Sequence, residues 1–191
     1  MSLTPSTMLS LGTPAPELGL PDAISGRTVQ LSEFSGSDAL LIMFICNHCP
    51  YVVHIQQGLT QFGRDYTDTN LAIVGINANS DQTHPQDGPE NMRALAEELD
   101  WQFPFLFDGT QTVAKTYRAA CTPEFYLFDG GHKLVYRGQF DGSRPGNQVP
   151  VTGTDLRDAV DAVLEGRSVP AEQYPGIGCN IKWHPGNEPD Y

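Results

Sequence analysis

The chain has 191 residues, a formal net charge of −12 at pH 7, and 39% hydrophobic against 18% charged residues. This composition is typical of a globular protein, and this length of one domain or at most two small ones. The negative charge disfavours binding to nucleic acid and to anionic membrane surfaces. Because the sequence shows neither a signal peptide nor an apolar run of membrane-spanning length, we expect a cytoplasmic protein.

The first half of the chain alternates between strand and helix patterns. An apolar segment at 39–45 predicts a central strand that is covered on both faces. It ends at Cys46-Asn47-His48-Cys49, and the apolar stripe that follows predicts a helix with Pro50 in its first turn. A strand at 71–77 and a helix at about 89–99 repeat this order, which indicates a parallel crossover.

The second half predicts shorter elements around an antiparallel hairpin. Asp129-Gly130-Gly131 forms the expected turn, because these residues tolerate positive φ, and a small hairpin is also expected around Gly26. Thr154 is the expected cap of the last helix, and Gly166 its end. The expected elements are a strand at 103–107, a helix at 110–118, hairpin strands at 124–128 and 133–137, and a helix at 154–165. Together they predict an α/β fold, with a mixed central sheet and helices on both faces.

The Cys46–Cys49 pair stands where a buried strand meets a helix, and this position predicts a redox-active disulfide. The amino end of a helix stabilises a thiolate, and the two-residue spacer lets one sulfur attack a disulfide while the other resolves it. His48 would favour the thiolate further if it were protonated. We expect Cys46 to titrate below the ~8.5 of an unperturbed thiol and to react faster than Cys49.

Other uses of the pair are half of a zinc site, a copper site, or simple core packing. A structural zinc site needs a second ligand pair, and Cys121, Cys179 and the remaining histidines lack matching spacing. Soft thiolates select Cu(I), so copper held by the pair and His48 is an alternative that is not an enzyme. The main expectation includes no metal and no cofactor.

Three features resemble the thioredoxin superfamily over about residues 12–165: the apolar strand, the cysteine motif at a helix start, and Thr122-Pro123 before the hairpin. The segment 12–18 is similar to the alkyl hydroperoxide reductase and thiol-specific antioxidant (AhpC/TSA) branch, the redoxins. Within that branch, the chain most resembles peroxiredoxin-like proteins with a two-cysteine motif. The resemblance implies a thioredoxin-like fold, Cys46 as the exposed nucleophile and Cys49 as the resolving thiol. It also implies a cis Thr122–Pro123 bond that presents backbone groups to an extended substrate.

Two departures from these families bear on the activity. Peroxiredoxins place threonine or serine three residues before the reactive cysteine, where this chain has Cys46, and no arginine lies between 121 and 124. Thioredoxins often keep a buried carboxylate at the place of Leu40. Glu124 is a candidate for that proton-transfer role, although a structural glutamate on the surface or on an edge strand is the alternative.

Cys121 and Cys179 are candidate extra redox thiols. Cys121 lies two residues before Pro123, so in this fold it would approach the pair; the alternative is a small residue that fits a tight loop. We expect one domain over 1–191, in which the tail 166–191 docks on the core because it is apolar. Gly176 and Gly178 would let the tail approach closely, which would bring Cys179 within disulfide range of Cys121 or Cys49 or leave it as an inert buried residue.

The function predicted from the sequence is thiol–disulfide oxidoreduction. Its partners would be a protein thiol or disulfide as substrate and a protein or small thiol as electron donor. The main alternative is an antioxidant peroxidase that reduces hydroperoxides through a cysteine sulfenic acid.

Overall fold

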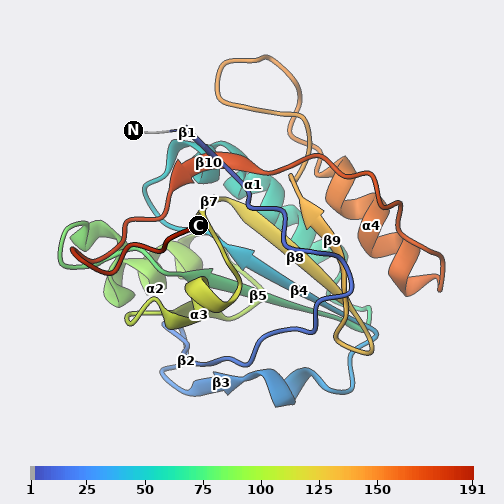
Figure 1. Cartoon of the computed structure of the whole chain (residues 1–191), viewed down its shortest axis with the longest axis horizontal. Helices are drawn as coiled ribbons and strands as arrows, with labels where there is room; N and C mark the ends of the chain where they lie inside the picture. Colours follow the sequence, from blue (N-terminus) through green and yellow to red (C-terminus); the bar gives the residue numbers. More distant parts are fainter. Residues whose placement is uncertain (1–2) are drawn as a thin grey trace.

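The computed structural model describes residues 3–191, so Met1 and Ser2, the start of the predicted domain, lie outside the described residues. A five-stranded mixed sheet forms its centre (Figure 1), in the order β6-β5-β4-β8-β9. The middle strand is fully buried, as its uninterrupted apolar sequence predicts. The strands are β4 (Ala39–Phe44), β5 (Leu71–Asn77), β6 (Phe105–Phe107), β8 (Glu124–Asp129) and β9 (Leu134–Gly138).

The earlier part of the chain contributes the parallel strands of the sheet, and the later part contributes the antiparallel hairpin. β4 runs parallel to β5, which runs parallel to β6, and these crossovers carry the helices. β4 also pairs antiparallel with β8, which forms a hairpin with β9. The predicted α/β fold with a mixed central sheet is therefore confirmed.

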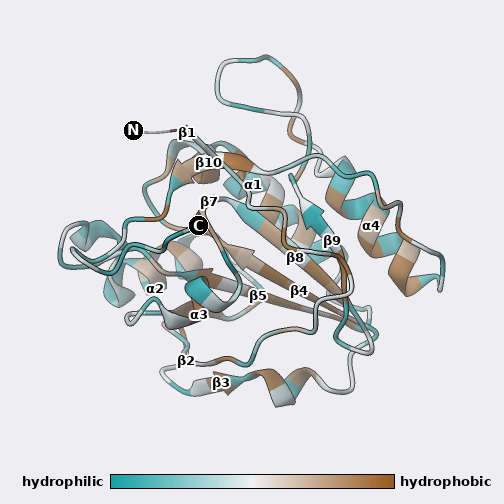
Figure 2. Ribbon diagram, in the orientation of Figure 1, coloured by the Kyte–Doolittle hydropathy of each residue, from teal (hydrophilic) through white to brown (hydrophobic). Residues whose placement is uncertain are grey.

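The helices and a small hairpin cover the two faces of this sheet. Apolar side chains of α1 (Pro50–Asp65), α2 (Pro89–Glu98) and α4 (Thr154–Leu164) share one core cluster with Met43 and Phe125. The other cluster joins the opposite sheet face to α3 and to the hairpin β2–β3. These elements are α3 (Thr112–Thr116), β2 (Gly19–Pro21) and β3 (Thr28–Gln30). Figure 2 shows that hydrophobic residues concentrate in the central strands.

Two local expectations were wrong. Thr154 is the first residue of α4 and not its cap, because Gly153 takes that place with φ +68° while the Asp141 carboxylate accepts its N–H. In the β8–β9 turn, His132 and not a glycine adopts positive φ. The Asp129 side chain stabilises this turn, because it accepts hydrogen bonds from the N–H groups of Gly131 and Lys133.

The carboxy-terminal tail forms part of a second, three-stranded sheet. β10 (Ile177–Asn180) lies between β1 (Leu3–Pro5) and β7 (Cys121–Thr122), antiparallel to both (Figure 1). Ile181 of the tail is fully buried, whereas Tyr174 is 68% exposed. Two short 3-10 helices, Leu31–Phe34 and Pro85–Asp87, complete the elements. Between residues 3 and 191, no helix is long and apolar enough to cross a membrane.

Candidate active site

The two cysteines of the motif occupy the junction between β4 and α1. Cys46 follows Ile45 at the end of the central strand, and Cys49 is the N-cap residue of α1, whose first residue is Pro50. The Cys49 carbonyl accepts hydrogen bonds from Val52 and Val53, which starts the helix. Both thiols are fully buried. The helix therefore starts at its N-cap residue Cys49, and Cys46, the nucleophile suggested by the sequence, lies three residues before it.

Thr122 contacts both sulfurs from the opposite side. Its Oγ1 lies 3.4 Å from Cys46 Sγ, and its carbonyl accepts a hydrogen bond from Cys49 Sγ at 3.2 Å. The Thr122–Pro123 peptide bond is cis, as predicted. Thr122 thus brackets the two thiols with one side-chain and one main-chain oxygen.

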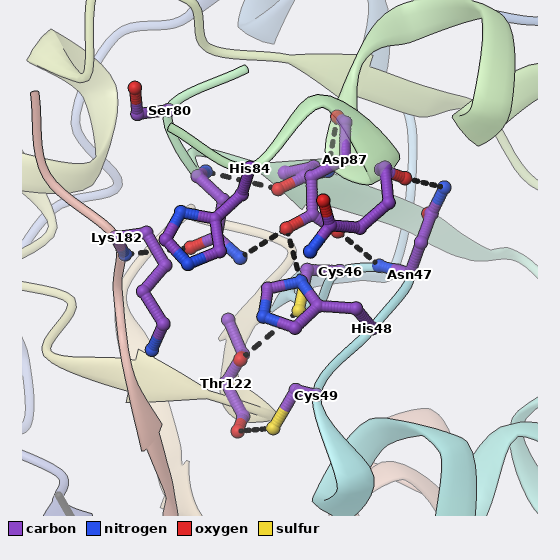
Figure 3. Close-up of polar contacts among 12 residues, drawn as sticks. Cys46, Asn47, His48, Cys49, Ser80, His84, Asp87, Thr122 and Lys182 are labelled. Carbon is purple, nitrogen blue, oxygen red and sulfur yellow. Dashed lines mark hydrogen bonds and ion pairs between the residues drawn. The ribbon is translucent and has the colours of Figure 1, made fainter. Parts of the chain in front are cut away.

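A buried carboxylate that the sequence did not reveal, Asp87, organises the rest of the motif (Figure 3). Asp87 has no exposed surface and accepts hydrogen bonds from the Asn47 N–H at 2.9 Å and from Asn79 Nδ2 at 2.9 Å. It also contacts His48 Nδ1. Asp87 precedes α2 in a segment that the sequence showed only as irregular, so only the three-dimensional contact identifies it.

A second histidine extends this polar cluster. The rings of His48 and His84 stack with centroids 5.1 Å apart. Burial, and then the electrostatic interactions with His48 and Lys182, lower the pKa of His84. Asn79 links the cluster to the tail, because its Oδ1 accepts the Lys182 N–H at 2.8 Å. The cluster is thus held by the loop after β5 and by the tail.

The directions of the two pKa shifts favour Cys49 over Cys46 as the more acidic thiol. A hydrogen bond from Cys46 lowers the pKa of Cys49, and contributions from Cys179, Thr122 and the Val52 N–H act in the same direction. The pKa of Cys46 is raised by that hydrogen bond, by burial and by the negative charge of Asp87. This order is the opposite of the one predicted from the sequence. Cys49 caps the helix, and Asp87 lies beside Cys46.

The two further cysteines lie on β7 and β10. Cys121 is fully buried; its sulfur contacts the Pro123 carbonyl at 3.9 Å and Glu124 Oε2 at 4.0 Å. Burial and the charge of Glu124 raise the pKa of Cys121. Cys179 pairs in register with Thr122 and interacts with the Cys49 thiol. Of the two, Cys179 is the thiol that the structure brings to the pair through a direct interaction.

Glu124 is buried on an interior strand, so the alternative of a surface or edge-strand glutamate was wrong. β8 lies between β4 and β9, and the Glu124 carboxylate accepts hydrogen bonds from Ser6 Oγ and from the Ala120 N–H. Side chains alternate along a strand, so Glu124 shares the sheet face of Tyr126, whereas Cys46 and Cys49 belong to the opposite cluster with Phe125. Burial raises the pKa of Glu124. Its contacts are those of a structural group that orders the β7 segment.

One group of side chains could offer ligand atoms to a metal ion. Cys46, His48 and Asp87 each have a donor atom within 4.8 Å of the others. This group contains one sulfur, one nitrogen and one carboxylate, and it does not include Cys49. It therefore differs from the two thiolates and a histidine of the copper alternative, since Cu(I) prefers soft sulfur ligands.

Comparisons with known proteins place this geometry in a family. The model of the AhpC/TSA family matches residues 11–137. The structure is similar to crystal structures of an uncharacterized conserved protein from Geobacillus kaustophilus and of a hypothetical protein from Sinorhizobium meliloti. The first is 51% identical with a TM-score of 0.95, covering 97% of this chain and 98% of that one. The second is 50% identical with a TM-score of 0.94, covering 96% and 100%.

More distant structures share the fold. The thioredoxin domain of a thiol-disulfide oxidoreductase from Bacteroides vulgatus has a TM-score of 0.61 at 20% identity, covering 82% of this chain and 99% of that one. No curated protein matches.

Proposed function

Because the chain belongs to the AhpC/TSA family of the thioredoxin superfamily, we propose that it is a thiol–disulfide oxidoreductase that cycles Cys46 and Cys49 between dithiol and disulfide. The observation that carries this proposal is the pairing of an acidified thiol at a helix start, Cys49, with a second buried thiol, Cys46, across Thr122. A thiolate and a resolving thiol are the two groups that disulfide exchange requires.

The reaction begins at Cys49. Its thiolate attacks one sulfur of the substrate disulfide, forms a mixed disulfide and releases the other sulfur as a thiolate that takes up a proton. Cys46 then attacks Cys49 Sγ, which leaves a Cys46–Cys49 disulfide and the second reduced substrate thiol. An external dithiol or protein thiol donor returns two electrons to complete the cycle.

His48 and Asp87 serve the second step. Cys46 must lose its proton before it attacks, and burial and the Asp87 charge keep that thiol protonated. A ring nitrogen of His48 lies within 4.8 Å of Cys46 Sγ, so the imidazole is placed to accept the proton through a small movement. The Asp87 carboxylate orients the ring through Nδ1.

We propose protein disulfides as the substrates, and protein or small thiols as the electron donors. We place the protein in the cytoplasm, since four cysteines in 191 residues are too few for a disulfide scaffold and suit a reducing compartment.

Hydroperoxide reduction is the second candidate, and the burial of both sulfurs favours it. A folded protein reaches a fully buried thiol less readily than a small oxidant does. In that reaction the Cys49 thiolate attacks the O–O bond, becomes a sulfenic acid and releases an alcohol or water. Cys46 then condenses with the sulfenic acid to give the same disulfide and a second water.

Reduction of a model protein disulfide in the presence of a small dithiol tests the proposal. Cys49→Ser should abolish the reaction, and Cys46→Ser should trap mixed disulfides at Cys49. Wild-type protein that leaves the protein disulfide intact but consumes a hydroperoxide would establish the second candidate instead. Equal residual activity in both variants would contradict either chemistry at this pair.

A further inference from the structure

The tail strand β10 occupies the edge of β7 directly beside the reactive pair. Cys179 pairs in register with Thr122, and Asn180 pairs with Cys121. Thr122 is the residue whose two oxygens contact Cys46 and Cys49. β10 also contacts α1, the helix that Cys49 caps. A segment from the far end of the sequence therefore completes the surroundings of the thiols.

Gly178 determines how closely this strand approaches. A Cβ at Gly178 would lie 1.9 Å from the Thr122 carbonyl oxygen, so only glycine fits this position. At Gly176, a Cβ would lie 3.2 Å from the carbonyl oxygen of Gly138. Gly178 thus lets the backbone of β10 meet that of β7, and Cys179 is the next residue.

Cys179 is buried, with 3% of its surface exposed, in the same core cluster as Cys46 and Cys49. The interaction between the two thiols lowers the pKa of Cys49, and together with burial it raises the pKa of Cys179. Cys179 and Cys46 are thus two buried thiols that both interact with Cys49. Cys121 differs, since its contacts are with Pro123 and Glu124.

We propose that Cys179 is a second resolving thiol for Cys49, so that the active site is a three-cysteine unit with Cys49 at its centre. The inference rests on the proposed function and extends it. A mixed disulfide at Cys49 has two internal thiols that can attack it, one on the loop before α1 and one on the tail. The tail is consequently part of the reaction and not only a cover.

The step balances without any further oxidant. Cys179 loses its proton and attacks Cys49 Sγ of the mixed disulfide, so that a Cys49–Cys179 bond forms and the bond to the substrate sulfur breaks. The substrate leaves as a thiolate and takes up a proton. Cys46 can then attack Cys49 in the new disulfide, which returns Cys179 to a thiol and gives the Cys46–Cys49 disulfide.

The decisive experiment uses the full chain with Cys46→Ser, so that only the tail thiol can resolve. The protein is treated with diamide or with a model aromatic disulfide, then alkylated, digested and mapped by mass spectrometry. We expect an intramolecular Cys49–Cys179 disulfide. We also expect the mixed disulfide to last at least about tenfold longer in Cys46→Ser/Cys179→Ser than in Cys46→Ser. Equal lifetimes in the two variants, without a Cys49–Cys179 link, would overturn the proposal.

A matched control separates the role of Cys179 from a general effect of removing a buried thiol, and the wild type tests the proposed function itself. Cys46→Ser/Cys121→Ser removes a buried thiol of the neighbouring strand and should behave as Cys46→Ser alone. The mapping in Cys46→Ser retains the native tail, so it does not depend on how well a Cys179 variant folds. Wild-type protein that forms no Cys46–Cys49 disulfide would contradict the proposed function, whereas loss of only the Cys179 link would contradict this inference alone.

Discussion

The Asp87 carboxylate contacts the His48 imidazole from a loop 39 residues further along the chain. The same carboxylate accepts the N–H of Asn47, so it fixes both the backbone and the histidine of the cysteine motif. Its charge also raises the pKa of Cys46. One buried side chain thereby contributes to the raised pKa of Cys46, after the hydrogen bond with Cys49 and burial.

The first prediction concerns the order of alkylation. Cys49 has the lowered pKa because Cys46 donates a hydrogen bond to it, so its thiolate persists at pH values where an ordinary thiol is protonated. Between about pH 6 and 7, where an unperturbed thiol with pKa ~8.5 is mostly protonated, Cys49 should react at least about tenfold faster than Cys46. Timed alkylation with peptide mapping measures both rates, and faster modification of Cys46 would restore the assignment made from the sequence.

Asp87→Asn should lower the pKa of Cys46, because it removes a negative charge beside that thiol. The measurement is the pH dependence of Cys46 alkylation in a Cys49→Ser background, which removes the coupled thiol. An amide would also face the Asn79 donor, at a stability cost of about 1–3 kcal/mol. Asp81→Asn, in the same loop, is the control for a general charge effect. An unchanged Cys46 titration in Asp87→Asn would show that the carboxylate acts only structurally.

How much of this site the sequence predicts depends on how local each contact is. The apolar run of β4, the cysteine motif and Pro50 are adjacent in the chain, so their arrangement follows from strand and helix patterns. The contact of Asp87 with His48 joins distant segments, and no spacing rule connects them. The raised pKa of Cys46 has partly the same origin, since the spacing of the motif does not reveal the Asp87 charge beside this thiol.

The sequence marked Glu124 as a candidate residue but did not reveal its hydrogen-bond partners. A glutamate after a proline suggested either proton transfer or an exposed strand. In the structure it accepts hydrogen bonds from Ser6 and the Ala120 N–H within a fully covered sheet. The Ser6 partner lies 118 residues earlier, on a segment that follows β1. The hydrogen bond between Glu124 and Ser6 forms only because the segment after β1 docks beside β7.

Glu124→Gln should therefore leave the alkylation rate of Cys49 unchanged and alter the pH dependence of stability. Burial raises the pKa of Glu124 in the folded state. For an acid with a raised pKa, its contribution to stability is fully present below the unfolded value of ~4.3 and declines as the pH rises through the folded pKa. The neutral glutamine escapes this decline, so the variant should gain stability relative to wild type as the pH increases. Urea unfolding at several pH values measures the difference, and a parallel pH dependence would contradict the prediction.

The last prediction tests whether the tail strand controls access to the pair. Gly178→Ala would place a methyl group 1.9 Å from the Thr122 carbonyl oxygen, a backbone atom that cannot move aside without displacing β7. β10 should therefore separate from β7, which moves Cys179 away from Cys49 and uncovers the buried thiols. We expect faster reaction of Cys49 with a bulky aromatic disulfide, a raised Cys49 pKa because the Cys179 hydrogen bond is lost, and lower stability. Gly36→Ala is the matched control, because a Cβ at Gly36 meets nothing within 4 Å. If Gly178→Ala loses stability while Cys49 keeps its pKa and its rate toward the bulky disulfide, the tail does not gate the site.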